Sequence, residues 1–135
     1  MLSGDGALAR QGVISIIDDD HSVRESIARL VRSLGHCAAV FSSAEEYLRS
    51  DRIRDCACVI TDLHMRGMSG ADLQDRLIAD GYRTPIIFMT AHFEEKARAR
   101  ALHAGAFGFL RKPFADEGLI ACLDEAMKDS DDTLA

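Results

Sequence analysis

The feature that most constrains the fold of this chain is a repeated alternation of short apolar runs with helix-like segments. The apolar runs are Val13–Ile17, Cys37–Phe41, Cys56–Thr61, Ile86–Met89 and Ala106–Leu110. The first is nearly continuous in hydrophobicity, as expected of a strand that is covered on both faces. Strands that alternate with helices are typically parallel and joined by right-handed crossovers. We therefore expect an α/β fold with a doubly wound, five-stranded parallel sheet and helices on both faces.

Apolar spacing and end signals define the helices between these strands. The first helix carries its apolar face on Val23, Ile27, Leu30, Val31 and Leu34 and should end at Gly35. Its N-cap is predicted to be Asp20 or Ser22, and Ser22 with Glu25 has the form of a capping box. The later helices are expected to begin at Ser43, to include Leu73, Leu77 and Ile78, to span about Glu94–Ala104, and to include Leu119, Leu123 and Met127.

The length of 135 residues is that of one domain. We expect a flexible lead-in over residues 1–12, one folded domain over residues 13–128, and an acidic tail or the start of a linker over residues 129–135. Whether the natural protein is free-standing or carries a further output domain is left open by these boundaries.

Composition excludes several classes of function. The net charge of −6 provides no basic surface, so we do not expect this chain to bind nucleic acid directly. Its apolar runs are far shorter than the roughly 20 residues that cross a bilayer, and we expect a cytoplasmic protein without membrane contact. Reduced, mostly buried cysteines fit that compartment, and a single C-x-C pattern gives little support for zinc. The cysteines are Cys37, Cys56, Cys58 and Cys122.

Polar residues follow the ends of four of the expected strands. Asp18 and Asp19 follow the first strand, Asp62 the third, Thr90 the fourth and Lys112 the fifth. Parallel strands present all their carboxyl ends at one edge of the sheet, where ligands bind in open α/β folds. We therefore expect these five side chains to form one site.

The chemistry of this set favours phosphoryl transfer. Carboxylate oxygens of Asp19 and Asp62, with Asp18 acting through water and a main-chain carbonyl in the following loop, suit Mg²⁺, and Mn²⁺ could replace it. The Thr90 hydroxyl and the Lys112 amine suit phosphoryl oxygens. Asp62 is the candidate nucleophile, because aspartyl phosphate is a known covalent intermediate. Neither a G-x-x-x-x-G-K-[ST] nor a G-x-G-x-x-G loop is present, so the phosphoryl donor should be external.

Four motifs carry a resemblance to a known family. They are I-I-D-D-D-H-S-V-R, V-I-T-D-L-H-M-R-G-M-S-G, I-I-F-M-T-A-H and G-A-F-G-F-L-R-K-P-F. From about Val13 to Met127 the chain resembles the response-regulator receiver domains of two-component signalling. It is most similar to those of nitrogen-fixation and nodulation regulators of the FixJ and NodW type, which precede helix-turn-helix output domains. The resemblance implies a flavodoxin-like (CheY-like) fold with strand order 2-1-3-4-5.

The resemblance also implies a function and a ligand set. Asp62 would accept a phosphoryl group from the phosphohistidine of a sensor histidine kinase or a phosphotransfer protein. Mg²⁺ would be held by Asp19, Asp62 and the main-chain carbonyl of His64, with Asp18 acting through water. Such a domain is a signalling phosphoacceptor rather than an enzyme, since it catalyses only its own phosphorylation and autodephosphorylation.

Thr90 and Phe109 match the switch pair of the family, in which the aromatic rotamer follows the movement of the hydroxyl. A core role for Phe109 is equally consistent with its apolar character. The resemblance implies an output face formed by the fourth helix, the fifth strand and the fifth helix (α4-β5-α5 in the family), through which a homodimer could form on phosphorylation. It also implies a cis Lys112–Pro113 bond.

Two further features lie in the loops that follow the site residues Asp62 and Thr90. Where the family usually has Met-Pro, this chain has Met65-Arg66, so we expect a more mobile loop. His64 and His92 each stand two residues after a site residue. They are either modulators of autodephosphorylation or ordinary exposed histidines.

Two alternative functions remain open. Asp18-x-Asp20 after a strand also occurs in haloacid-dehalogenase-type phosphatases, where Asp18 would be the nucleophile. That interpretation leaves Asp62 without a role. A phosphorylation-independent receiver-like binding module is the other alternative. The cognate kinase, the regulated process, the oligomeric state and the phosphoryl lifetime are not encoded in any motif.

Overall fold

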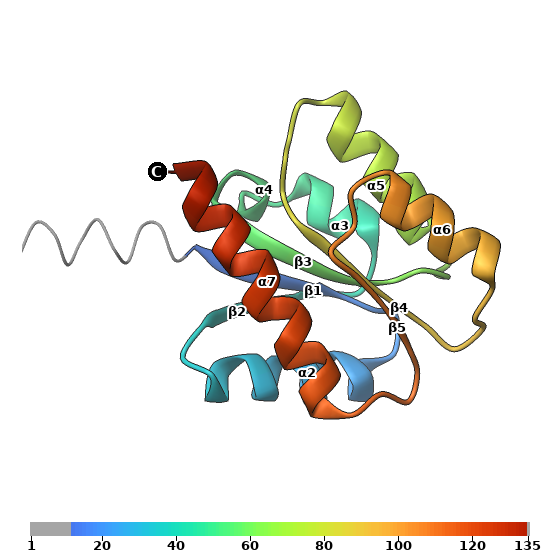
Figure 1. Cartoon of the computed structure of the whole chain (residues 1–135), viewed down its shortest axis with the longest axis horizontal. Helices are drawn as coiled ribbons and strands as arrows, with labels where there is room; N and C mark the ends of the chain where they lie inside the picture. Colours follow the sequence, from blue (N-terminus) through green and yellow to red (C-terminus); the bar gives the residue numbers. More distant parts are fainter. Residues whose placement is uncertain (1–11, 135) are drawn as a thin grey trace, which may run out of the picture.

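The computed structural model describes residues 12–134, which form a five-stranded parallel sheet with strand order β2-β1-β3-β4-β5 (Figure 1). The strands are β1 (Val13–Ile17), β2 (Cys37–Phe41), β3 (Cys56–Asp62), β4 (Ile86–Thr90) and β5 (Gly108–Arg111). This confirms both the predicted fold class and the predicted strand order. The expected lead-in, apart from Gly12, lies outside the described residues.

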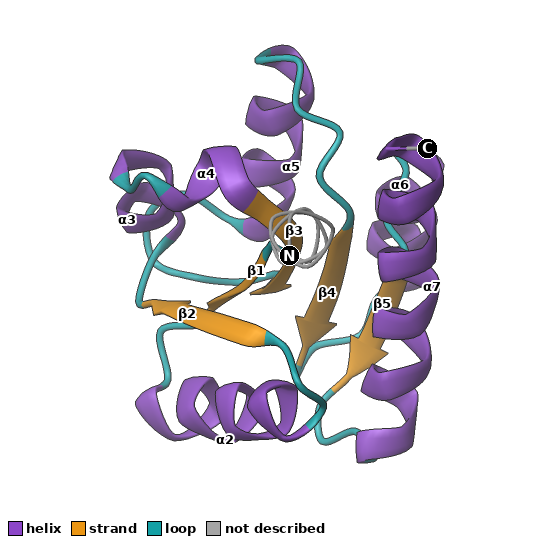
Figure 2. Ribbon diagram, turned by 90° about the vertical axis from the view of Figure 1, so that its left-hand side faces the viewer, coloured by secondary structure: helices purple, strands orange, loops and turns teal. Residues whose placement is uncertain are grey.

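Helices cover both faces of the sheet (Figures 1 and 2). On one face, α2 and α7 pack against the strands, and α3, α5 and α6 pack on the other. The helices are α2 (His21–Ser33), α3 (Ala44–Arg49), α4 (Arg52–Asp55), α5 (Gly70–Ala79), α6 (Glu95–His103) and α7 (Asp116–Leu134). Within the described residues, no helix is both long enough and apolar enough to span a membrane.

The central strands are buried on both faces, as their sequence predicted. Ile14, Ile16 and Ile60 are fully buried on the side of α2 and α7, whereas Val59 and Phe88 are fully buried on the opposite side. Full burial of one such side chain stabilises a fold by about 1.5–3 kcal/mol. The two apolar layers therefore hold the sheet rigid beneath the edge that carries the polar residues.

The first helix begins two residues earlier than a Ser22 cap would place it. Asp20 is the N-cap, and its carboxylate accepts a hydrogen bond from the Val23 amide at 3.1 Å. Ser22 lies inside the first turn, so its capping-box interpretation was wrong. Asp20 takes this role because the Asp18 carboxylate accepts a hydrogen bond from the Asp20 amide at 2.8 Å, which turns the chain directly after β1. The predicted Ser43 cap of α3 is confirmed, with a bond from the Glu46 amide at 3.0 Å.

Other differences concern element ends and single apolar residues. Helix α7 continues to Leu134, through most of the expected acidic tail. Strand β5 begins at Gly108 rather than Ala106, and the short helix α4 was not predicted. Ile78 is 52% exposed, although its spacing suggested a core position. All four cysteines are free, and Cys37 is exposed rather than buried.

The start of α5 lies directly against the end of β3. A Cβ atom at Gly70 would lie 2.6 Å from the Asp62 carbonyl oxygen and 3.1 Å from the Leu63 Cα atom. Only glycine permits this approach without displacing backbone. Gly70 thus allows the loop that follows Asp62 to return and pack against the end of β3.

Candidate functional site

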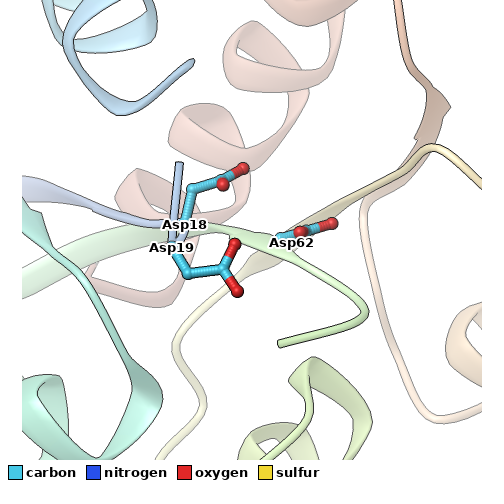
Figure 3. Close-up of side chains that lie close together, drawn as sticks. All are labelled: Asp18, Asp19 and Asp62. Atoms are coloured by element: carbon cyan, nitrogen blue, oxygen red, sulfur yellow. The ribbon is translucent and has the colours of Figure 1, made fainter. Parts of the chain in front are cut away.

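Three carboxylates meet at the carboxyl edge of the sheet (Figure 3). Asp18 and Asp19 follow β1, Asp62 ends β3, and these two strands pair directly with Ile17 opposite Thr61. One oxygen from each carboxylate lies within 4.8 Å of the others. Asp18 is fully buried, Asp62 is 8% exposed, and Asp19 is exposed. The expected gathering of these acids is thus present in the fold.

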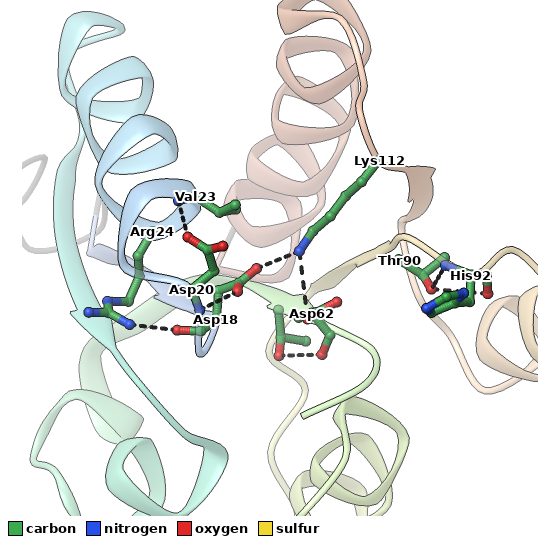
Figure 4. Close-up of polar contacts among 9 residues, drawn as sticks. Asp18, Asp20, Val23, Arg24, Asp62, Thr90, His92 and Lys112 are labelled. Carbon is green, nitrogen blue, oxygen red and sulfur yellow. Dashed lines mark hydrogen bonds and ion pairs between the residues drawn. The ribbon is translucent and has the colours of Figure 1, made fainter. Parts of the chain in front are cut away.

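Lys112 reaches into this cluster from the end of β5 (Figure 4). Its Nζ atom lies 2.8 Å from Oδ2 of Asp18 and 3.6 Å from Oδ2 of Asp62. Its main chain is anchored by a 2.7 Å hydrogen bond from its amide to the Thr90 carbonyl. The ammonium group therefore bridges two carboxylates that come from different strands.

Burial and the charges of neighbouring groups shift the pKa values of Asp62 and Lys112. Burial raises the pKa of Asp62, and the neighbouring Asp18 and Asp19 add to that rise, while Lys112 opposes it. Burial alone would lower the pKa of Lys112, but its hydrogen bond and ion pair with Asp18 outweigh this and raise it. The cluster thus holds three acids and one ammonium group, which contacts Asp18 and Asp62.

The donor set fits a hard divalent cation. Carboxylate oxygens are the ligands that Mg²⁺ prefers, and a cation there would offset the repulsion that raises the pKa of Asp62. Both oxygens of Asp18 already accept hydrogen bonds, from the Asp20 amide and from Lys112, whereas Asp62 contacts Lys112 only at 3.6 Å. This difference favours an indirect role for Asp18, as the sequence suggested.

Arg24 supports the acidic loop, and sequence reasoning missed it. One guanidinium nitrogen donates to the Asp18 carbonyl at 2.8 Å (Figure 4). A second guanidinium nitrogen lies 3.1 Å from His21 Nδ1. The Asp18 amide in turn donates to the Phe41 carbonyl at 3.1 Å. The loop after β1 is therefore fixed from both sides. An arginine one turn into the helix was the only available sequence signal.

Thr90 lies at the same edge, but its hydroxyl is turned away from the acids (Figure 4). Oγ1 donates to the His92 carbonyl at 3.1 Å and accepts from the His92 amide at 3.0 Å. Thr90 itself is fully buried. The structure brings together four of the five predicted side chains and leaves this hydroxyl bonded within its own loop.

Phe109 lies in a short row of aromatic rings and stands opposite Phe88 in the pairing of β4 with β5. Its ring centroid is 6.1 Å from that of Phe88 and 5.9 Å from that of Phe93. The guanidinium carbon of Arg111 lies 4.6 Å from the centre of the Phe93 ring. Phe109 is half-buried, which fits either a switch residue or a core residue. Its contact with Phe93, and the contact of Arg111 with Phe93, were not foreseen.

The two histidines come from adjacent loops and face each other. The ring centroids of His64 and His92 are 6.2 Å apart, in an edge-to-face arrangement. They join the loop that follows β3 to the loop that follows β4. The Lys112–Pro113 bond is cis, as the resemblance implied.

Comparisons with known proteins agree with this geometry. The family model of the response regulator receiver domain matches residues 14–124. The chain is 40% identical over 119 residues to the response regulator protein TmoT of Ectopseudomonas mendocina, covering 88% of this chain and 54% of that protein. It is 38% identical over 110 residues to the transcriptional regulatory protein FixJ of Azorhizobium caulinodans, covering 82% and 52% respectively. It therefore spans about half the length of these relatives.

A solved structure shows the same architecture. The response regulator StyR superposes with a TM-score of 0.83 at 36% identity, covering 90% of this chain and 61% of that one. The matched range, residues 14–124, spans the positions of the acid pair, Asp62, Thr90 and Lys112. On this agreement of sequence and fold, the chain belongs to the response regulator receiver domains of two-component signalling.

Proposed function

We propose that this domain accepts a phosphoryl group on Asp62 from the phosphohistidine of a sensor histidine kinase or phosphotransfer protein. The observation that carries the proposal is the position of Lys112, whose ammonium group lies 3.6 Å from Oδ2 of Asp62 at the edge of an acid cluster. An acidic nucleophile beside a fixed cation suits transfer of a group whose charge lies on its oxygens.

The transfer forms one bond and breaks one. A carboxylate oxygen of Asp62 attacks the phosphorus, while the bond from phosphorus to the donor imidazole nitrogen breaks. The bonding electron pair stays on that nitrogen. Lys112 offsets the negative charge of the phosphoryl oxygens. Mg²⁺, held by Asp19, Asp62 and the His64 carbonyl with Asp18 acting through water, would supply further positive charge when bound.

An apolar groove beside Lys112 suits the protein that brings the donor. It has a volume of about 540 Å³ and lies between α2 and the segment that leads into α7. Its lining includes Val23, Ile27, Leu30, Pro113 and Phe114. A helical donor with an apolar face could contact this groove and present its phosphohistidine to Asp62.

Metal removal tests the proposal. With a small phosphodonor such as acetyl phosphate and Mg²⁺, intact-mass spectrometry should find one labile phosphoryl adduct, and excess EDTA should prevent it. If Mn²⁺ restores formation of the phosphoryl adduct, this would support a site for hard divalent cations. A folded chain that binds Mg²⁺ yet gains no adduct would contradict the proposal and favour the phosphorylation-independent binding module.

The phosphoryl group would act on the rest of the domain through Thr90 and Phe109. To reach a phosphoryl group on Asp62, the Thr90 hydroxyl must leave its two hydrogen bonds with His92. That movement would free space beside Phe109 and alter α6, β5 and α7, the output face through which a homodimer could form.

Replacing Thr90 with alanine should separate phosphorylation from switching. The variant should still gain the adduct, within about tenfold of the native rate, because Asp62 and Lys112 are unchanged. Phosphorylation should then cause smaller NMR shift changes at Phe109 and along α6. If phosphorylation of the variant causes NMR shift changes as large as in the native domain, Thr90 does not couple Asp62 to Phe109 and α6. Thr84→Ala, a substitution far from the acid cluster on the chain leading into β4, serves as the control.

The haloacid-dehalogenase-type alternative receives less support. It needs Asp20 as a general acid or base, whereas the Asp20 carboxylate caps α2 through the Val23 amide. It also gives no role to Asp62, which lies at the centre of the cluster.

A further inference from the structure

The loop between β3 and α5 is held in its middle by a side chain from another element. Main-chain hydrogen bonds fix the two ends of the loop. The Leu63 amide donates to the Met89 carbonyl at 2.8 Å, and the Gly70 amide donates to the Leu63 carbonyl at 2.9 Å. Between these ends, the Met68 amide donates to Oε2 of Glu45 at 2.9 Å. Glu45 stands in the first turn of α3. The loop is therefore tied across the sheet edge to a different helix.

Gly67 makes this contact sterically possible. Its φ angle is +75°, and a Cβ atom there would lie 2.5 Å from Oε2 of Glu45. A larger residue would displace the carboxylate. The contact also has the character of a charge-assisted hydrogen bond, because the bond from Met68 lowers the pKa of Glu45 and keeps it ionised.

The neighbouring residue explains why such a contact matters here. Arg66 has no ring that fixes its φ angle, and the Gly67 that follows takes a positive φ that few other residues adopt. His64, whose carbonyl belongs to the proposed cation site, lies four residues before Met68 in the same loop. A loop anchored only at its ends would leave that carbonyl less well defined.

We propose that Glu45 is a positioning residue for the metal-binding loop, holding the segment that carries the His64 carbonyl by way of the Met68 amide. This inference rests on the proposed function, since it concerns the same cation site. Glu45 does not bind the cation. Its effect passes through the loop, as hydrogen-bonding partners of metal ligands set the orientation of those ligands.

Mg²⁺ titration of Glu45→Ala, Glu45→Gln and Glu46→Ala tests the proposal. Glu46 is the matched control, because it carries the same charge in the same turn but its carboxylate accepts from the Ser42 amide at 2.7 Å and not from the loop. Glu45→Ala should weaken Mg²⁺ binding about tenfold, the lower end for residues that orient ligands. Glu45→Gln keeps an acceptor and should recover most of the affinity. Glu46→Ala should change it less than about twofold.

Amide hydrogen exchange without metal gives an independent readout. The Met68 amide should exchange faster in Glu45→Ala than in Glu46→Ala, while urea unfolding verifies that both variants are folded. Equal Mg²⁺ affinities in the native chain and Glu45→Ala, or an equal loss in Glu46→Ala, would overturn the positioning role and leave the proposed function intact. A native chain that binds no Mg²⁺ at all would overturn both.

Discussion

Replacing Lys112 with alanine is expected to slow phosphorylation of Asp62 by about 10²- to 10³-fold, the usual effect of removing one donor that stabilises developing charge. The same change should destabilise the metal-free domain by about 2–3 kcal/mol. Asp18 is fully buried and its ion pair with Lys112 is 2.8 Å long, so the variant retains a buried carboxylate without its cation. The Lys112 side chain is 18% exposed, so the expected loss of stability is smaller than for a wholly buried ion pair.

A double substitution separates these two effects. Adding Asp18→Asn to Lys112→Ala removes the unpaired charge, so urea unfolding should recover part of the lost stability. The rate of adduct formation should not recover, because the cation near Asp62 is still missing. A double variant that regains both stability and rate would show that Lys112 acts only on folding. Lys96→Ala, on the exposed surface of α6, controls for loss of a positive charge.

Asp62→Asn should abolish the phosphoryl adduct and also stabilise the metal-free domain at neutral pH by about 1–2 kcal/mol, the scale of an imperfectly neutralised charge cluster. The sign follows from the raised pKa of Asp62. An acid whose pKa is higher in the folded than in the unfolded state disfavours folding when ionised, so stability is gained as pH falls through that pKa. Asparagine removes this ionisation.

Urea unfolding in EDTA across pH 4 to 8 measures the effect. The advantage of Asp62→Asn should be largest at neutral pH and should shrink as the native Asp62 becomes protonated. Asp124→Asn, on the exposed side of α7, should show no such trend. A variant less stable than the native domain at pH 7 would mean that Lys112 neutralises the cluster fully.

The fold could be predicted because it follows from the apolar pattern of short segments. Most of the site residues could be predicted because they directly follow those segments. Continuous apolar strands such as Val13–Ile17 indicated a parallel sheet, and that topology forces Asp18, Asp62 and Lys112 to one edge. The N-cap of α2 was left open between Asp20 and Ser22. Asp20 takes that role because the turn begins with a local hydrogen bond from its amide to the Asp18 side chain, which the apolar pattern of the helix does not indicate.

Side-chain orientation was not predictable in the same way. Nothing in the motif around Thr90 indicates that its hydroxyl bonds to His92 rather than facing the acids. The contacts of Glu45 with Met68, and of Arg111 with Phe93, join elements that only the finished fold brings together. They depend on the path of loops, for which the sequence carries no periodic signal.

The most direct test of the account is to map the phosphorylated residue. Reduction of the aspartyl phosphate with borohydride converts the modified aspartate to homoserine, which peptide mass spectrometry can locate. We expect homoserine at position 62 alone, in the presence of Mg²⁺ and a phosphodonor. Homoserine at position 18 would contradict it and restore the phosphatase-type alternative, in which Asp18 is the nucleophile.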